Sequence, residues 1–328
     1  MREGGCRVNQ KMQKLRAAVI GVGYLGRFHV QKFAALEDAG LVAVVDIDRI
    51  KAEDVSRRVK AAAYTDYREI IGHIDLVSIA VPTENHYPIA RACLEAGIHV
   101  LVEKPMTRTL EEAEHLIELA RSHGCVLQVG HLERFSPALL ALRGTLNHPL
   151  FIESHRITQF RERGTDVSVV LDLMIHDIDL ILSMVDSPIV AIRPMGFPVL
   201  TEEIDIANAR LEFANGCVAH VTASRVSRSL MRKMRLFQPD SYISIDYLEH
   251  TIAICRRLYD QSRVRIVEEV RSFMQGDALM LEIRAFVEAV KNGTPPVVSG
   301  EEGKRALAVA LAITHAIRQK PGFQTGPV

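Results

Sequence analysis

Short apolar runs alternate with helix-length amphipathic segments over the first 130 residues of the chain. The apolar runs are Ala17–Gly23, Leu41–Asp46, Leu76–Pro82, His99–Pro105 and Cys125–Gly130. Between the last two, apolar positions fall on one face of Thr109–His123, with Thr109 as the N-cap and Gly124 after the last turn. Continuous apolar strands separated by helices predict a doubly wound parallel sheet that is covered on both faces.

The pattern changes after residue 150, where strand-like runs follow one another without helices between them. These runs are Ile206–Phe213, Cys217–Arg225, Lys233–Pro239, Tyr242–Leu248 and Thr251–Arg257. Asn215-Gly216 between the first two is a strong signal for a hairpin turn. Helical patterns return over Ala278–Lys291 and Glu301–Arg318, and we expect these helices to pack back near the first part of the chain. The second half therefore predicts a large, open and mostly antiparallel sheet.

These patterns divide the α/β chain into two domains, as its length of 328 residues also suggests. We expect a disordered tail over residues 1–14, with Met12 as an alternative start, and a doubly wound domain over 15–130. An α+β domain over 131–320, serving substrate binding and oligomerisation, and a tail over 321–328 complete the chain.

A glycine-rich turn gives the first domain a candidate ligand. Gly21-Val22-Gly23-Tyr24-Leu25-Gly26 follows a buried strand and opens a helix, and Asp46 ends the next strand about 20 residues later. Such glycines let a pyrophosphate approach the helix N-terminus, and the acidic residue accepts hydrogen bonds from the adenosine ribose. No arginine immediately follows Asp46, so the Rossmann-type turn predicts NAD rather than NADP. The alternative is that these residues form a strand–turn–helix with a structural role and no bound cofactor.

The composition of the chain argues against nucleic-acid binding, membrane insertion and secretion. The 40 Lys and Arg balance the 40 Asp and Glu, which excludes the broad basic surface typical of nucleic-acid binders. No apolar run approaches the roughly 18 residues of a membrane span, and the N-terminal residues lack the apolar core of a secretory signal. The five cysteines are scattered without CxxC spacing, so we expect a cytoplasmic protein without disulfides or structural zinc.

Two further motifs bring in candidate chemistry. Glu103-Lys104-Pro105 ends a strand at the carboxyl edge of the sheet, where ligands bind in open α/β folds. Asp172 and His176 are four residues apart and so share one face of a predicted helix. The alternative interpretations are that Lys104 is a surface lysine at a strand end and that Asp172 and His176 are a buried hydrogen-bonded pair. A metal site is not expected, because Asp172, His176, Asp177 and Asp179 match zinc-ligand spacing only superficially.

With Ala80–His86 and Val129–Phe135, these motifs resemble those of the Gfo/Idh/MocA oxidoreductases, from about Lys14 to Gln319. The resemblance implies that Lys104 and His176 flank the reacting hydroxyl and that Asp172 assists. Oxidation of a secondary alcohol needs a hydride acceptor and a base, and histidine titrates near neutrality. His176 is the first choice for the base and Lys104 for a proton relay or electrophile, with the reverse assignment open. The expected cofactor-binding residues are Gly21, Gly23, Tyr24, Leu25, Gly26, Asp46, Ile47, Val81, Pro82, Thr83, His86, Glu103, Lys104 and His131.

Basic residues of the second domain form two groups along the sequence. They comprise Arg156, Arg161 and Arg163, and then Arg225, Arg228, Arg232, Lys233 and Arg235. They form either a solvated strand face or a cation-lined cleft for an anionic substrate, since arginine binds phosphate oxygens bidentately. The expected substrate-binding residues are Lys104, Arg163, Asp172, His176 and Arg225.

Within the family, the stretches Gly130–Ala138 and Arg161–Asp179 look most like nucleotide-sugar 3-dehydrogenases, although Ser136 replaces the more usual asparagine. This resemblance implies NAD-dependent oxidation of UDP-N-acetylglucosamine to its 3-keto form. A separate pyridoxal-phosphate aminotransferase then makes a 3-amino sugar for lipid A. The alternatives are a dehydrogenase of a UDP-N-acetylglucosamine uronate, a free hexose or an inositol, and a non-catalytic NAD-binding sensor or regulatory protein.

The predicted second sheet also indicates the oligomeric state of the protein. At least six strands are expected between Phe151 and Val270, and the two late helices are expected to cover only its inner face. A broad and partly apolar outer face is larger than monomers usually expose. We therefore expect a homodimer or homotetramer that pairs these faces, as the family resemblance also implies.

Overall fold

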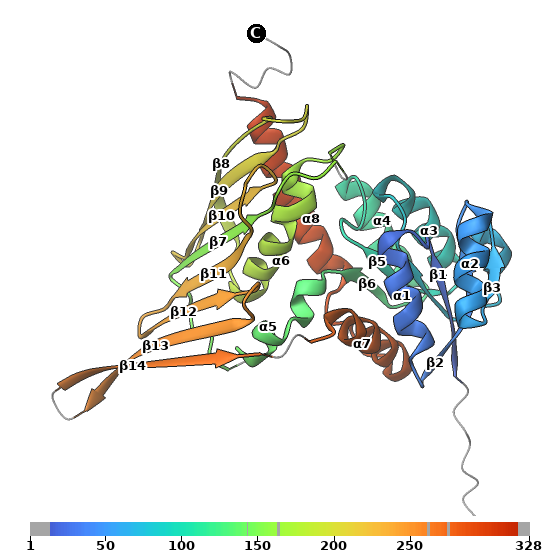
Figure 1. Ribbon diagram of the computed structural model, residues 1–328, viewed down its shortest axis with the longest axis horizontal. Helices are drawn as coiled ribbons and strands as arrows, with labels where there is room; N and C mark the ends of the chain where they lie inside the picture. Colours follow the sequence, from blue (N-terminus) through green and yellow to red (C-terminus); the bar gives the residue numbers. More distant parts are fainter. Residues whose placement is uncertain (1–13, 143, 163–164, 261–262, 274–275, 321–328) are drawn as a thin grey trace, which may run out of the picture.

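The computed structural model describes residues 14–320, apart from 143, 163–164, 261–262 and 274–275. Apart from Lys14, both expected tails lie outside these residues. Two sheets stand apart with helices between them (Figure 1). No helix in the described ranges combines the length and hydropathy needed to cross a membrane.

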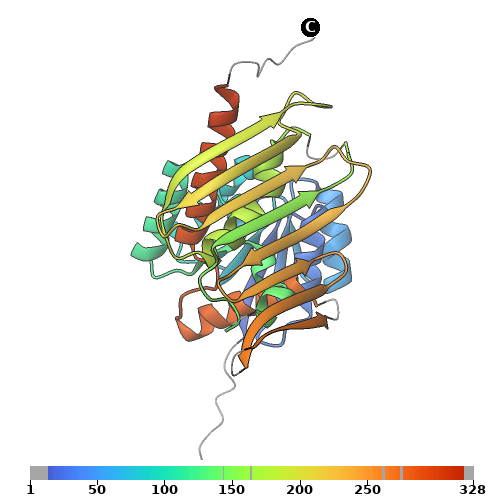
Figure 2. The ribbon, with the colours of Figure 1, turned by 90° about the vertical axis from the view of Figure 1, so that its left-hand side faces the viewer.

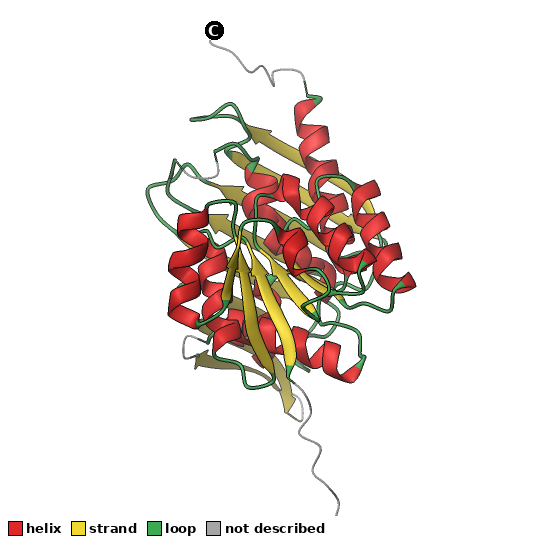
Figure 3. Cartoon of the chain, turned by 90° about the vertical axis from the view of Figure 1, so that its right-hand side faces the viewer, coloured by secondary structure: helices red, strands yellow, loops and turns green. Residues whose placement is uncertain are grey.

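The first sheet is parallel, with strand order β3-β2-β1-β4-β5-β6 and helices on both faces (Figure 3). This confirms the predicted doubly wound fold and adds the three-residue strand β3, which is too short to carry a pattern. The strands are β1 (Leu15–Ile20), β2 (Ala39–Val45), β3 (Ala62–Tyr64), β4 (Leu76–Ile79), β5 (His99–Glu103) and β6 (Leu127–Gly130). The helices are α1 (Tyr24–Ala34), α2 (Arg49–Val59), α3 (His86–Glu95) and α4 (Leu110–Ser122).

Helix α4 shows how closely local sequence specifies an element. The Thr109 hydroxyl accepts a hydrogen bond from the backbone N–H of Glu112, and the Glu112 carboxylate accepts one from the backbone N–H of Thr109. This reciprocal capping box begins the helix where the sequence predicts it. Gly124, at φ +64°, follows the C-cap and turns the chain away.

The second sheet has eight strands in the order β14-β13-β12-β11-β7-β10-β9-β8. Neighbouring strands pair antiparallel except β7 and β10, which are parallel. The predicted hairpin joins β9 and β10, and Gly216 adopts φ +87° in its turn. The strands are β7 (Phe151–Ile157), β8 (Ile189–Phe197), β9 (Ile206–Phe213), β10 (Val218–Ser224), β11 (Met231–Phe237), β12 (Ser241–Asp246), β13 (Thr251–Asp260) and β14 (Arg263–Ser272).

The inner face of this sheet packs on α6 (Ile175–Met184) and α8 (Gly300–Arg318), beside the short α5 (Pro137–Ala141). Helix α7 (Ala278–Asn292) packs instead on the first domain, where Phe286 joins Phe33 of α1 in one buried core. Helix α8 contacts both α4 of the first domain and β8 of the second sheet. Both late helices therefore reach the first domain, but the expectation that both cover the second sheet is wrong for α7. An amphipathic pattern shows that a helix face is buried and does not specify its partner.

The outer face of the sheet carries no helix within the described part of the chain (Figure 2). Phe151, Phe237 and Tyr242 form a row of ring contacts across β7, β11 and β12, with centroid separations of 5.6 and 5.0 Å. Ion pairs lie beside the row, including Arg235 with Glu153 at 2.7 Å. This face is a mixture of aromatic and paired charged side chains.

Candidate functional site

The glycine-rich turn before α1 fits a bound pyrophosphate. Gly21 has φ +86°, and a Cβ there would lie 2.5 Å from the carbonyl oxygen of Ala80. A Cβ on Gly26 would lie 1.8 Å from the carbonyl oxygen of Gly21, whereas one on Gly23 meets no atom within 4 Å. The first and third glycines are thus required by packing, and the second leaves open space at the helix N-terminus. Helix α1 begins there without a side-chain cap, as an anion-binding terminus requires.

Asp46 lies where the sequence predicts it, just after β2. Its carboxylate oxygens accept hydrogen bonds from the backbone N–H groups of Val22 and Asp48, both at 2.9 Å. A carboxylate has about four lone-pair sites, so two donors leave capacity for ribose hydroxyls. The adjacent Ile47 side chain is 95% exposed. The pair therefore fits the adenosine end of NAD.

A cavity of about 740 Å³ runs from the glycine-rich turn to the second domain. It brings together most of the expected cofactor-binding residues with Asp172 and Arg225. It also adds residues that the sequence did not single out, mainly from the segment after β7. The lining residues are Gly23, Tyr24, Leu25, Ala80, Val81, Pro82, Thr83, His86, Glu103, Lys104, Thr158, Gln159, Arg161, Asp172, Leu173, Arg225 and Leu230.

Lys104 and Asp172 meet in this cavity. The Lys104 ammonium donates to the main-chain carbonyl oxygen of Asp172 at 2.7 Å and lies 3.4 Å from its Oδ1 atom. Asp172 stands in a π-helical turn, Val170–Met174, that leads directly into α6. π-bulges are frequent at functional sites, and a π-turn shifts the i, i+4 alignment of an α-helix. The sequence predicted the helix without this change of pitch.

His176 lies one turn beyond Asp172, partly buried, and is not among the described residues that line the cavity. Its Nδ1 atom is buried and has no hydrogen-bond partner in the described structure. Burial lowers the pKa of His176 well below 6.5, and the nearby positive charges of Lys104 and Arg156 lower it further. The imidazole is therefore neutral near pH 7, where the sequence alone predicted ordinary titration.

The two histidines expected near the cofactor are both buried. The ring nitrogens of His86 lie 2.9 Å from the carbonyl oxygens of Pro105 and Val81, so the ring ties the Lys104 turn to the end of β4. Burial lowers the pKa of His86, and a neutral ring can donate to only one of these carbonyls. His131 is 1% exposed, 4.0 Å from Asp179, and is not among the described residues that line the cavity.

The expected basic groups are divided among different environments. Arg163 lies outside the described residues. Arg225 lines the cavity but also contacts Asp205 at 3.4 Å and donates to the carbonyl oxygens of Val167 and Ile204. Arg156 is buried in a bidentate pair with Asp177, at 2.8 and 3.1 Å. Arg161 also lines the cavity, at its second-domain side.

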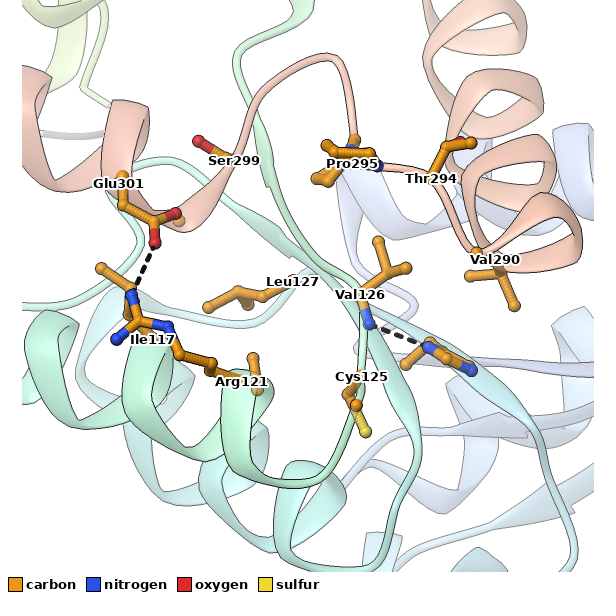
Figure 4. Close-up of a pocket in the computed structure, with 16 residues that line it drawn as sticks. Ile117, Arg121, Cys125, Val126, Leu127, Val290, Thr294, Pro295, Ser299 and Glu301 are labelled. Atoms are coloured by element: carbon orange, nitrogen blue, oxygen red, sulfur yellow. Dashed lines mark hydrogen bonds and ion pairs between the residues drawn. The ribbon is translucent and has the colours of Figure 1, made fainter.

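A second cavity, of about 370 Å³, lies away from this site between α4, β6 and the segment before α8 (Figure 4). Cys125 and Leu127 line it, and Arg121 pairs with Glu301 at its rim, at 3.2 Å. It lies at the amino ends of β5 and β6, whereas Lys104 follows the carboxyl end of β5. It is therefore separate from the Lys104 site. No group of three or more metal-ligating side chains occurs among the described residues.

Comparison with known proteins extends over both domains. Residues 15–131 match a model of an oxidoreductase family with an NAD-binding Rossmann fold, and residues 139–237 match the GFO/IDH/MocA C-terminal domain. The chain is 37% identical to UDP-N-acetylglucosamine 3-dehydrogenase of Acidithiobacillus ferrooxidans over 93% of this chain and 98% of the relative. A solved structure of that enzyme has a TM-score of 0.87, with the same coverage.

More distant relatives also match over most of the chain. Myo-inositol 2-dehydrogenase of Thermotoga maritima is 26% identical over 93% of this chain and 97% of the relative. A levoglucosan dehydrogenase solved with NADH and levoglucosan is 20% identical, with a TM-score of 0.83 over 94% of this chain and 98% of its own. At 20% identity, the similarity to levoglucosan dehydrogenase shows a shared fold only. Taken with the near full-length match above, these findings show that the chain belongs to the Gfo/Idh/MocA oxidoreductases, with an NAD-binding Rossmann domain.

Proposed function

We propose that the protein oxidises the 3-hydroxyl of a nucleotide sugar, converting UDP-N-acetylglucosamine to its 3-keto form with NAD. The observation that carries this proposal is the contact of Lys104 with Asp172 in the cavity between the glycine-rich turn and the second domain, with neutral His176 one turn away. These groups combine a hydrogen-bond donor with a proton acceptor at the sheet edge where the cofactor binds.

The chemistry divides between cofactor and chain. Bound NAD supplies the hydride acceptor. His176 is the proposed base for the hydroxyl proton, because its lowered pKa keeps the ring neutral near pH 7. The Lys104 ammonium, oriented by Asp172, donates to the substrate oxygen as negative charge develops on it. Support for this division comes from Lys104 already donating to Asp172, which suits a donor better than a base.

The nucleotide part of the substrate is proposed from size, charge and similarity. A cavity of about 740 Å³ is within the range of binding sites for drug-sized ligands, and Arg161 and Gln159 line its second-domain side. Arginine there suits a diphosphate. The Acidithiobacillus relative, by its name, acts on UDP-N-acetylglucosamine. We further propose that a pyridoxal-phosphate aminotransferase consumes the ketone to form a 3-amino sugar for lipid A.

Absorbance at 340 nm tests the proposal. We expect NADH to form with UDP-N-acetylglucosamine and not with free hexoses or myo-inositol, with the ketone trapped before it decays. Activity on inositol alone would favour the second candidate, since relatives from Thermotoga maritima and Bacillus subtilis are inositol dehydrogenases, 26% and 27% identical. Saturable NAD binding without turnover of any sugar would favour a non-catalytic sensor.

Two further properties belong to this proposal. The free cysteines Cys93, Cys125, Cys217 and Cys255 suit a reducing cytoplasm, which we propose as the location of the protein. The uncovered outer face of the second sheet, with its aromatic row, suits isologous pairing in a homodimer or homotetramer.

A further inference from the structure

A cluster of buried polar side chains lies beneath the Lys104 turn, on the face of the first sheet that α1 and α7 cover. Its members come from four strands and helices besides β5, and we call it the inner polar cluster: His29, Ser78, Glu103, Gln128 and Glu282. All except Glu103 are fully buried, and the Glu103 side chain is 12% exposed where it reaches the cavity. Polar groups buried this deeply are normally hydrogen-bonded.

Three members of the inner polar cluster, Ser78, His29 and Glu103, have hydrogen-bond partners. Ser78 Oγ lies 2.8 Å from His29 Nδ1, and His29 Nε2 lies 3.0 Å from Glu103 Oε1. The backbone N–H of Lys104 points to the second Glu103 oxygen at 3.3 Å. Burial alone would raise the pKa of Glu103, but His29 and Lys104 outweigh it and the pKa is lowered. Glu103 is thus an anion held by its neighbours.

The acceptor oxygens of the other two members, Gln128 and Glu282, lack a hydrogen-bond donor. Both carboxyl oxygens of Glu282 are buried without a hydrogen-bond partner in the described structure, and so is Gln128 Oε1. The amide nitrogen of Gln128 donates elsewhere, to the main-chain carbonyl of Glu282 at 3.3 Å. The strand register puts Gln128 and Glu103 on one face of the neighbouring strands β6 and β5, and the hydrogen bond from Gln128 brings Glu282 beside them. The unpartnered acceptors of Gln128 and Glu282 therefore lie near Glu103 with no donor to them among the described residues. An ionised Glu282 would also place a second buried negative charge near that of Glu103, which disfavours the ionised form.

We propose that Glu282 is kept as a neutral carboxylic acid in the working enzyme, and that its O–H is the donor this cluster otherwise lacks. Glu282 is then a positioning residue: it restrains Gln128 beside Glu103, and through them the adjoining Lys104. This second statement rests on the proposed role of Lys104, whereas the protonation of Glu282 does not.

The surrounding charges are consistent with a neutral acid. Burial raises the pKa of Glu282 well above its usual range, and the negative charge of Glu103 raises it further. Of the other charged groups on elements packed against α7, Arg27 of α1 is exposed, and the rest are paired with acids or bases outside the cluster. These are Lys32 of α1 with Asp277, and Glu133 and Arg134 of the Leu132–Phe135 turn with Arg156 and Asp179.

Infrared spectroscopy tests the protonation without any substrate. The difference spectrum of the wild-type protein minus Glu282→Gln at neutral pH should contain the carbonyl band of a protonated carboxylic acid. Glu288→Gln, on the exposed face of the same helix, is the matched control and should give only a carboxylate difference. A carboxylate band alone from Glu282 overturns the proposal. Because no sugar is added, this result is independent of the proposed substrate.

Thermal melting gives a second readout with a defined sign. The folded chain keeps a proton on Glu282 that the unfolded chain releases above a pKa near 4.5. Wild-type Tm should therefore fall relative to that of Glu282→Gln as pH rises from about 5 to about 8, because the unfolded state then binds fewer protons. A constant gap between the two proteins over this range contradicts a neutral acid.

Kinetics test the positioning role. Glu282→Gln keeps a neutral donor of the same shape and should retain kcat within about threefold, while Glu282→Leu removes the donor and should lower kcat roughly tenfold with the Kd for NAD unchanged. Rescue by glutamine but not leucine is not expected of a residue that only fills space. Full kcat in Glu282→Leu overturns the positioning role. If the leucine variant does not fold, loss of more than about tenfold in Glu282→Gln overturns it instead.

Discussion

Replacing Gly23 by alanine tests whether the glycine-rich turn is shaped by its ligand or by its own packing. A Cβ on Gly23 meets no atom within 4 Å, whereas a Cβ on Gly26 would lie 1.8 Å from the carbonyl oxygen of Gly21. Both substitutions add one methyl group to the same turn, so Gly26→Ala is the matched control. We expect Gly23→Ala to fold normally and bind NAD weakly, and Gly26→Ala to lose stability whether or not NAD is present.

The magnitudes follow from these contacts. Gly23 is the N-cap of α1 at φ −65°, which alanine can adopt, so the folded state should lose no more than about 1 kcal/mol. If a pyrophosphate packs against this position, the extra methyl overpacks the contact by roughly 1–3 kcal/mol. That corresponds to a Kd for NAD raised about 5- to 150-fold. At Gly26 the methyl overlaps a backbone oxygen, so the free energy of unfolding should fall by about 3 kcal/mol or more.

Calorimetric titration with NAD and thermal melts of the two variants measure both quantities. The expected pattern is a nearly wild-type Tm with weak NAD binding for Gly23→Ala, and a much lower Tm for Gly26→Ala. Wild-type affinity in a well-folded Gly23→Ala protein would show that the pyrophosphate does not occupy the space beside Gly23. The turn would then need another ligand or another mode of binding.

Four other predictions follow from the same structure. Asp46→Ala should weaken NAD binding and reduce discrimination against NADP, as competition between the two cofactors would measure; equal wild-type affinity for both refutes it. Lys104→Ala should leave a folded, NAD-binding protein with turnover lowered roughly 10²-fold or more, and near-normal turnover would remove Lys104 from the mechanism. Because burial and nearby cations lower the pKa of His176, the acid limb of kcat/KM should lie below pH 6.5 and vanish in His176→Ala; an unchanged profile contradicts its role as base. Light scattering at micromolar concentration should give the mass of a dimer or tetramer of the 36.6 kDa chain, and a monomer mass would show that the outer sheet face is solvated.

The parts of this fold that can be predicted from sequence depend on short-range signals. The glycine-rich turn, the capping box at Thr109 and the hairpin at Asn215-Gly216 each occupy a few consecutive residues, and their local geometry needs no distant partner. The alternation of strands and helices likewise predicts the doubly wound sheet. The motifs of the Lys104 site are widely spaced along the chain. The site can still be predicted, because the carboxyl ends of parallel strands meet at one edge of the sheet.

What escaped prediction involves partners far apart in the chain. The sequence places Arg156 in a basic group, yet the structure buries it against Asp177 and Glu133. These partners lie on a helix and a turn that the pattern does not place beside β7. His29 meets Glu103 in the same way, from α1. The π-turn at Asp172 has no sequence signature of its own, because the same residues could form an α-helix. The partners of Arg156 and His29 and the π-turn at Asp172 are determined by contacts between distant parts of the chain rather than by local propensity.

Helix α7 links the folding of the first domain to the order in which the chain is synthesised. The sheet of that domain is complete at Gly130, but the apolar face that contains Phe33 is closed only by Phe286 and its neighbours. The whole second sheet is made in between, which takes on the order of ten seconds at ribosomal rates. Throughout that interval the nascent first domain exposes hydrophobic surface to chaperones and to other chains. A fragment that stops at the end of the second sheet would keep the cofactor-binding turn and lack one wall of its core.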